Sequence, residues 1–244
     1  MVKGLDIFRQ YFEKYADQYV LIGGTACTVS FEQLNESFGR TTKDLDMVLI
    51  VEALTKEFGE KFWQFINDGE YRNRVKSNGK PQFYRFDKPN NPSFPEMIEI
   101  FSRTESILAE NSAVVPIHID DSVSSLSAIL LNDAYYRLLM EGRNVINGLS
   151  VLSPVWLIPF KAKAWLDLKQ SGNADSKDIK KHRNDIVRLA SGTVLGKCVL
   201  PEEVKNDMKV FIDSFEMSDA ELKNLNIKGV KAKDIKNILI ETYL

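Results

Sequence analysis

Two consecutive glycines after a short apolar run are the feature that most constrains this fold. The run covers residues 19–22, ends at Gly23 and Gly24, and precedes residues 26–34, which we expect to form a helix. A short apolar run bounded by glycine is typical of a buried strand that turns into a helix. Glycine lets a ligand approach the backbone closely, and the N–H groups that begin a helix attract anions. The pattern predicts either a tight turn alone or a turn that holds a phosphate, with Thr25 as a cap or a phosphate contact.

A pair of carboxylates opens the next apolar run. Asp44 and Asp46 flank Leu45, and residues 45–51 predict a second buried strand. Side chains two apart on a strand face the same way, so the two carboxylates are expected side by side. Mg²⁺ prefers such oxygen ligands and keeps water sites for substrate phosphates. The alternative is turn chemistry at a strand end, but uncompensated charge at the start of a core strand is costly.

A third carboxylate interrupts another apolar run. Glu99 lies within residues 97–101, which predict a core strand. A site with two metal ions usually needs a third carboxylate, so we expect Asp44, Asp46 and Glu99 to bind two Mg²⁺ ions. The alternative is an outward-facing Glu99 that pairs with Arg103.

Other features exclude several classes of protein. The sequence has neither a Rossmann nor a P-loop glycine pattern. Cys27 and Cys198 are isolated, which argues against zinc and disulfides and favours a reducing compartment. No signal sequence and no run of about 18 apolar residues is present, so we expect a cytoplasmic protein without a membrane partner. The net charge of −2 does not indicate a nucleic-acid binder.

The chain changes character near its middle. Residues 1–150 alternate strand-like and helical segments, with a hairpin signal at Asn147 and Gly148, whereas residues 151–244 are almost entirely helical. We therefore predict an α/β (α+β) fold, in which a mixed sheet with flanking helices precedes a mainly helical C-terminal part. The expected C-terminal helices cover residues 154–170, 176–191, 201–216 and 232–243.

The glycine turn and the paired carboxylates resemble a known family. Ile22-Gly23-Gly24-Thr25-Ala26 and Arg40-Thr41-Thr42-Lys43-Asp44-Leu45-Asp46-Met47 are similar to the nucleotidyltransferase-fold superfamily, and within it to the AbiEii group of abortive-infection toxins. The similarity covers residues 19–51, with a weaker match at 97–101. It implies a nucleotidyltransferase-like core over 1–150 and a helical domain over 151–244. The implied nucleotide-binding residues are Gly23, Gly24, Thr25, Arg40, Thr42 and Lys161.

Two helical segments extend the resemblance. Residues 159–164 are similar to a Lys-bearing helix of the family, and residues 176–182 to an Asp-containing segment. The resemblance implies that Lys161 contacts the triphosphate and that Asp178 supports the site. The chain departs from the family at Glu99, where an Asp is usual, and at Lys181, where a second Asp would be expected; Asp185 follows one helical turn later.

The same segment is strongly basic. Residues 161–190 hold eight basic and four acidic residues, a net charge of +4 on a chain with a net charge of −2. A basic face beside a metal site suits a triphosphate or an RNA end. The alternative is a solvated helix pair with ion pairs four residues apart, such as Lys181–Asp185.

The resemblance implies an Mg²⁺-dependent nucleotidyltransferase. It would move an NMP from an NTP to an RNA 3′ end, tRNA in particular, or to a protein hydroxyl, and would act as a toxin with an antitoxin partner. The implied catalytic residues are Asp44, Asp46, Glu99, Lys161 and Asp178. Two alternatives stay open: a non-catalytic nucleotide-binding regulator on the same fold, and a structural module whose glycines and aspartates only form turns.

Overall fold

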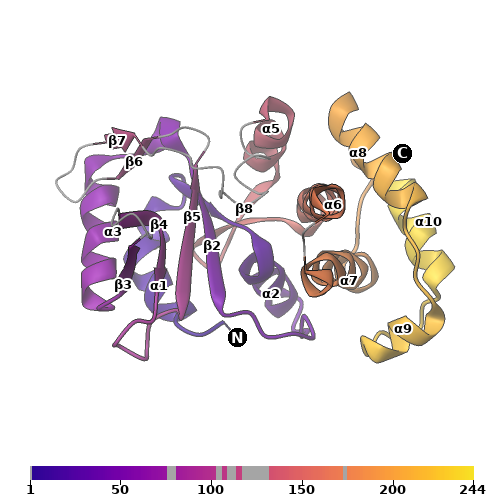
Figure 1. Cartoon of the computed structure of the whole chain (residues 1–244), viewed down its shortest axis with the longest axis horizontal. Helices are drawn as coiled ribbons and strands as arrows, with labels where there is room; N and C mark the ends of the chain where they lie inside the picture. Colours follow the sequence, from indigo (N-terminus) through magenta and orange to yellow (C-terminus); the bar gives the residue numbers. More distant parts are fainter. Residues whose placement is uncertain (1, 76–80, 103–105, 109–113, 117–131, 173–174) are drawn as a thin grey trace.

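A mixed sheet flanked by helices forms the centre of the molecule (Figure 1). The structure, a computed structural model, describes residues 2–75, 81–102, 106–108, 114–116, 132–172 and 175–244. The strands are β1 (Tyr19–Leu21), β2 (Asp44–Leu49), β3 (Arg72–Val75), β4 (Pro81–Asp87), β5 (Met97–Ser102), β6 (Ser106–Leu108), β7 (Val114–Pro116), β8 (Arg143–Ile146) and β9 (Leu149–Leu152). Seven of them form one sheet in the order β3-β4-β5-β2-β1-β9-β8, and β6 pairs with β7. The predicted mixed α/β class is confirmed.

Strand β2 lies at the middle of the sheet. It pairs antiparallel with β1 and parallel with β5. The three apolar runs that predicted core strands therefore lie side by side. In this register Asp46 lies directly opposite Glu99, so two of the predicted metal ligands are immediate neighbours across the strand pair.

Aromatic side chains fill the layer on one face of the sheet. The ring centroid of Phe8 in α1 (Leu5–Phe12) lies 5.5 Å from that of Tyr19 in β1, and the centroid of Phe62 in α3 (Lys56–Asp68) lies 5.6 Å from that of Phe86 in β4. Edge-to-face contacts of this kind add to the apolar burial. Helix α3 begins after Thr55, which caps it by accepting a hydrogen bond from the N–H of Phe58.

The three carboxylates lie on the opposite face. Successive side chains of a strand alternate between faces, so Asp44 and Asp46 point away from the aromatic layer while Leu45 and Met47 point into it. Helix α2 (Gly23–Gln33) contacts β2 and also α6 (Pro154–Ser171), which packs on α7 (Ser176–Gly192) (Figure 1). The acidic face of the sheet therefore adjoins these three helices.

A tight hairpin joins the last two strands of the sheet. Asn147 and Gly148 both have positive φ, 49° and 80°, as a type I′ turn requires, and the predicted turn is confirmed. Strand β9 then pairs in parallel with β1. The predicted boundary between residues 150 and 151 falls inside β9, and one continuous cluster of buried side chains runs from Val2 to Tyr243.

The C-terminal helices form a layer beyond α2. They follow α5 (Asp133–Gly142) and comprise α6, α7, α8 (Glu202–Asp213), α9 (Asp219–Asn224) and α10 (Ala232–Tyr243). The predicted helix 201–216 ends at Asp213, and α9, which the sequence did not predict, starts with a capping box of Ser218 and Glu221. Two short 3₁₀ helices, Glu13–Tyr15 and Val51–Ala53, complete the described elements.

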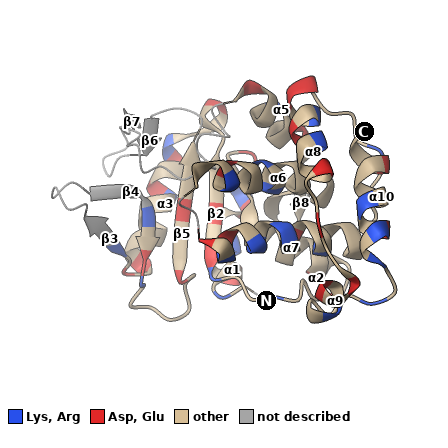
Figure 2. Cartoon of the chain, turned by 45° about the vertical axis from the view of Figure 1, so that its right-hand side comes forward, with Lys and Arg blue, Asp and Glu red and all other residues tan. Residues whose placement is uncertain are grey.

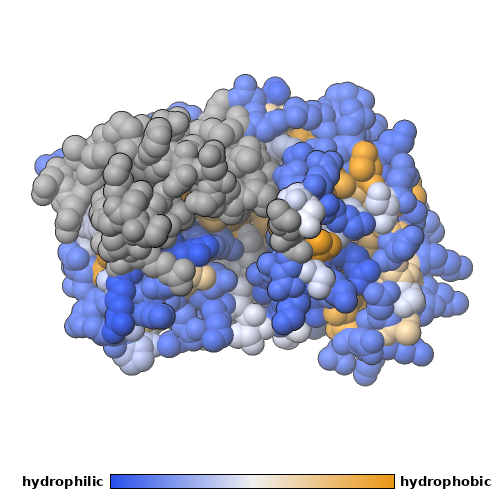
Figure 3. All heavy atoms as spheres, viewed as in Figure 1, coloured by the Kyte–Doolittle hydropathy of each residue, from blue (hydrophilic) through white to orange (hydrophobic). Residues whose placement is uncertain are grey.

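The surface is mainly polar on the face seen in Figure 3. Apolar residues on that face gather over the C-terminal helices (Figure 3). Val194 and Val199, in the extended segment before α8, are almost fully exposed. Within the described ranges, every helix is too short or too polar to cross a bilayer.

Candidate active site

The glycine turn and the carboxylate pair meet at the start of α2. Gly23 has φ of +64°, and a Cβ at this position would lie 1.9 Å from Oδ2 of Asp46. The carboxylate therefore lies against the backbone of Gly23, a contact that any other residue would obstruct. The N–H of Ile22 donates to the carbonyl of Asp46 at 3.0 Å. The two motifs of the sequence form one site.

The second glycine is covered by a hydroxyl and a guanidinium. A Cβ at Gly24 would lie 2.2 Å from Oγ1 of Thr42 and 2.9 Å from Nη2 of Arg40. The Arg40 side chain thus reaches the first turn of α2, whose N–H groups already favour an anion. The predicted nucleotide-binding residues Gly24, Arg40 and Thr42 are brought together here.

Thr25 has a structural contact in this turn. Its hydroxyl donates to the carbonyl of Asp44 at 2.8 Å, and the residue is fully buried. This bond ties α2 to the first residue of β2. The Thr25 hydroxyl, for which a helix cap or a phosphate contact was predicted, instead donates its proton to the strand that carries the carboxylates.

The three carboxylates share one side of the sheet and repel one another. Asp44, Asp46 and Glu99 are all half-buried. Burial, followed by the charges of Glu99 and Asp44, raises the pKa of Asp46 to about 7. Lys181 and Lys161 oppose this shift. A cation beside Asp46 would relieve the repulsion.

One buried acid organises the neighbouring cations. Asp185 of α7 accepts two hydrogen bonds from Arg40, Nε to Oδ1 and Nη2 to Oδ2, both at 2.7 Å. It also accepts from Nζ of Lys161 at 2.8 Å. Burial raises the pKa of Asp185, but Lys161 and Arg40 outweigh it and hold that pKa below its usual range. Burial alone would lower the pKa of Lys161, but the negative charge of Asp185 outweighs burial and raises that pKa above its usual value.

A third cation adds to this group. Nη1 of Arg188 lies 4.0 Å from Oδ1 of Asp185. The guanidinium carbons of Arg188 and Arg40 lie 5.9 Å and 5.4 Å from the ring centroid of Phe38. Three cations around one carboxylate leave a net charge of +2. We call Arg40, Lys161, Arg188 and Asp185 the cation group.

His182 lies close to the cation group and is neutral at pH 7. Burial, then the charge of Lys161, lowers its pKa to about 3. Its Nδ1 is buried and has no hydrogen-bond partner among the described residues. A neutral imidazole adds no further positive charge to the group.

The predicted supporting residue Asp178 lies elsewhere on α7. It is exposed in the first turn of that helix, whereas Asp185, two turns further along, contacts Lys161. The other basic residues of this segment divide between ordinary surface contacts and the site. Lys163 pairs with Asp167 and Arg183 with Glu221, whereas Lys181 acts on Asp46 through its charge. Figure 2 shows basic residues along α7 and acidic residues on β2 and β5.

Glu99 has a partner that the sequence did not reveal. Arg85 of β4 lies opposite Glu99 in the antiparallel β4–β5 register, and its Nη2 forms an ion pair with Oε1 of Glu99. Arg103, the partner expected in the alternative interpretation, lies outside the described residues. The pairing of β4 with β5 depends on the tertiary fold, so the sequence of neither strand alone predicts it.

The donor set suits a hard cation, although its members are not gathered into a finished metal site. In the described part of the chain, no group of three or more His, Cys, Asp or Glu side chains is arranged to hold a metal ion. Asp46 and Glu99 are nonetheless strand neighbours, with Asp44 on the same face. Carboxylate oxygens are the ligands that Mg²⁺ prefers, and mutual repulsion of this kind is what a bound cation relieves.

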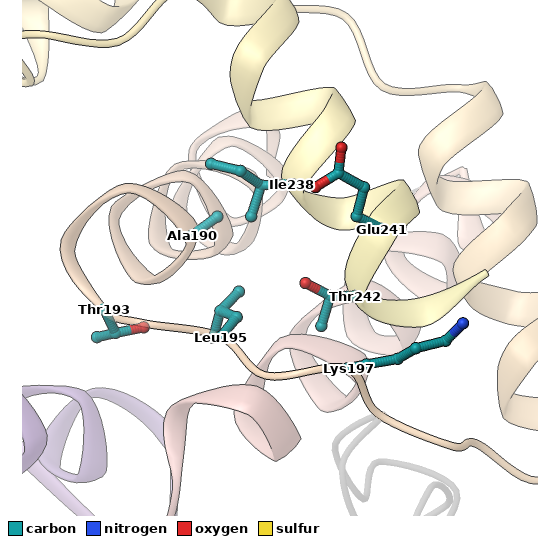
Figure 4. A pocket seen from close by; sticks show the side chains of 7 residues that line it. All are labelled: Ala190, Thr193, Leu195, Lys197, Ile238, Glu241 and Thr242. Carbon is teal, nitrogen blue, oxygen red and sulfur yellow. The ribbon is translucent and has the colours of Figure 1, made fainter.

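A separate pocket lies between the end of α7, the segment that follows it, and α10 (Figure 4). Leu195 and Ile238 supply apolar walls, and Lys197 and Glu241 are its charged members. Its lining includes neither the three carboxylates nor the cation group.

Comparisons of this chain with protein-family models, with curated proteins and with solved structures found no match.

Proposed function

We propose that this protein is a metal-dependent nucleotidyltransferase, which transfers an NMP group from an NTP to a hydroxyl acceptor. The observation that carries the proposal is the contact of Asp46 with Gly23, because it places an acidic sheet face directly beside an anion-binding helix start. Nucleotide transfer needs both: carboxylates for a metal ion and positive groups for a polyphosphate.

The triphosphate would lie at the start of α2. The first-turn N–H groups and the guanidinium of Arg40 supply positive charge on one side of Asp46. Arg40 is 19% exposed, whereas Lys161 is only 7% exposed at its side chain. Arg40 therefore contacts phosphate oxygens, and Lys161 with Asp185 fixes its position and supplies charge at short range.

The carboxylate face would hold Mg²⁺. Asp44, Asp46 and Glu99 would be its ligands, and the ion would promote loss of the acceptor proton and offset charge on the leaving pyrophosphate. The protein groups orient the nucleotide for in-line attack: Gly23 allows close approach, Thr25 fixes β2, and Arg40 stabilises the charge that develops on the phosphate oxygens.

The acceptor and the biological role follow from the family resemblance. We propose an RNA 3′ end, tRNA in particular, or a protein hydroxyl as the acceptor. A toxin role with an antitoxin partner belongs to the same proposal. The net positive charge of residues 161–190 favours a polyanionic acceptor.

A second candidate is a nucleotide-binding regulator without transfer activity. The ion pair between Arg85 and Glu99 favours it, because a carboxylate occupied by arginine is a weaker metal ligand. Nucleotide binding would still use Arg40 and the start of α2.

Label transfer separates these candidates. The protein is incubated with each α-³²P-labelled NTP, Mg²⁺, and either cellular RNA or a protein extract. We expect label in one acceptor fraction and none with the Asp44→Asn/Asp46→Asn variant, while the exposed control Asp213→Asn behaves as wild type. If the wild-type protein labels no more than the double variant, transfer is ruled out. An NTP-dependent rise in Tm would then support the regulator.

A further inference from the structure

We propose that Arg85 is a built-in counter-cation, which competes with a metal ion for Glu99 and makes the site select a metal–nucleotide complex over a free dication. This inference rests on the proposed function, because it concerns the metal-binding face of the same site.

A row of charged side chains crosses three strands of the sheet. Arg85 on β4 is the register partner of Glu99 on β5, and Glu99 is the register partner of Asp46 on β2. The row ends at Gly23, which lies against Asp46. Arg85 thus lies on the far side of the carboxylates from the start of α2, where the triphosphate is proposed to bind.

The two arginine–carboxylate pairs of the site differ in their attachment. Arg40 grips Asp185 through two nitrogens and two oxygens, a geometry that fixes both side chains. Arg85 pairs with Glu99 through Nη2, whereas its Nε has no partner within the described ranges. The Arg85 side chain is 35% exposed, against 18% for Glu99. A partly hydrated arginine whose Nε takes no part in the ion pair can give way to another cation.

The ion pair between Arg85 and Glu99 changes the net charge of the carboxylate face. When ionised, Asp44, Asp46 and Glu99 carry a charge of −3, and Arg85 reduces it to −2. A free dication is then attracted less strongly. A metal–triphosphate complex is itself anionic, so partial neutralisation lowers its repulsion from the same face. Arg85 therefore weakens binding of the free ion while it eases entry of the loaded nucleotide.

The proposal is tested by calorimetry, which measures the affinity of the full chain for Mn²⁺ in the absence of nucleotide. We expect Arg85→Gln to bind Mn²⁺ about fivefold more tightly, the order of effect of a partly exposed ion pair. Arg85→Lys keeps the charge and should bind as wild type does. The control Arg137→Gln removes an exposed arginine from α5 and should leave affinity unchanged. In a Glu99→Gln background, adding Arg85→Gln should change the Mn²⁺ affinity less than it does in the wild-type protein, because the carboxylate that Arg85 pairs with is gone.

The outcomes separate the role of Arg85 from the existence of the metal site. If wild type and Arg85→Gln bind Mn²⁺ equally, and both bind it more tightly than Asp44→Asn/Asp46→Asn, the role of Arg85 is overturned and the metal site stands. If neither wild type nor Arg85→Gln binds Mn²⁺ more tightly than Asp44→Asn/Asp46→Asn, both the role of Arg85 and the proposed function are overturned. Melting temperatures measured in parallel show that each variant is folded.

Discussion

The carboxylate of Asp46 lies directly against the backbone of Gly23. This contact joins the two strongest signals of the sequence, and it makes the identity of residue 23 a condition for the shape of the site. The positive φ of Gly23 and the missing Cβ are both needed, which distinguishes it from a glycine that only terminates an element.

Replacing Gly23 with alanine should therefore disrupt both stability and ligand binding. The new Cβ would collide with Oδ2 of Asp46 at a backbone angle that L residues rarely adopt. We expect the free energy of unfolding to fall by about 2–5 kcal/mol, measured by urea denaturation. Gly172→Ala is the matched control, because Gly172 has a φ of +67° and a Cβ added there would meet nothing within 4 Å; it should lower the free energy of unfolding by only about 1–2 kcal/mol. Equal losses would contradict the proposed contact.

Asp185 should be the most sensitive acid of the C-terminal helices. Asp185→Asn leaves Arg40 and the buried Lys161 without their shared counter-charge. Breaking a buried pair of this kind costs about 3–5 kcal/mol, which urea denaturation will detect. The exposed Asp178→Asn should change stability by less than about 0.5 kcal/mol. A larger loss with Asp178→Asn than with Asp185→Asn would restore the role that family resemblance gives to Asp178.

The Thr25 hydroxyl should contribute to the positioning of β2. Thr25→Val keeps the shape but removes the hydrogen bond to the carbonyl of Asp44, leaving that buried region with one unmade bond. We expect the free energy of unfolding, measured by urea denaturation, to fall by about 1–2 kcal/mol. Thr28 is the comparison on the same helix, since its hydroxyl donates to the carbonyl of Gly24 four residues earlier and not to another element among the described residues. Thr28→Val should cost less, and the reverse order of losses would show that the tie to β2 is unimportant.

Stability should depend on pH through Asp46. Its pKa is raised in the folded protein, from 3.8 to about 7, so the native state holds this proton more tightly than the unfolded chain. The contribution of Asp46 to stability therefore decreases as pH rises from about 4 to about 7, and levels off above that. Asp46→Asn should remove this decrease, so its stability relative to wild type should grow over the same interval. Chemical denaturation at several pH values measures the difference, and parallel curves would refute the assignment.

Local patterns in the sequence predicted the frame of this site. Gly23, Gly24, Asp44 and Asp46 lie at the ends of apolar runs, so strand alternation and turn chemistry place them without knowledge of the fold. The hairpin at Asn147 and Gly148 is confirmed for the same reason, because its conformation is set by two residues. Glu99 was predicted to lie near Asp46, and the parallel register of β2 with β5 places the two opposite each other.

The partners that complete the site depend on long-range packing. Asp185 lies on a helix rich in charge, and nothing in the local spacing distinguishes it from Asp178; only the packing of α7 on α6 brings it to Lys161. The pairing of β4 with β5 brings Arg85 to Glu99. Arg188 joins the site because the fold brings it close to Asp185 and Phe38. The extra helix α9 escaped prediction because its only strong signal is the capping box at Ser218 and Glu221.

The hydrogen bonds between Arg40 and Asp185 join residues 145 positions apart in the chain. On a translating ribosome, at about 5–20 residues per second, the carboxylate strand would be made roughly 7–30 s before Asp185. During that interval the nascent chain carries its acidic residues without the acid that fixes Arg40. The cation group therefore cannot assemble until α7 has been synthesised.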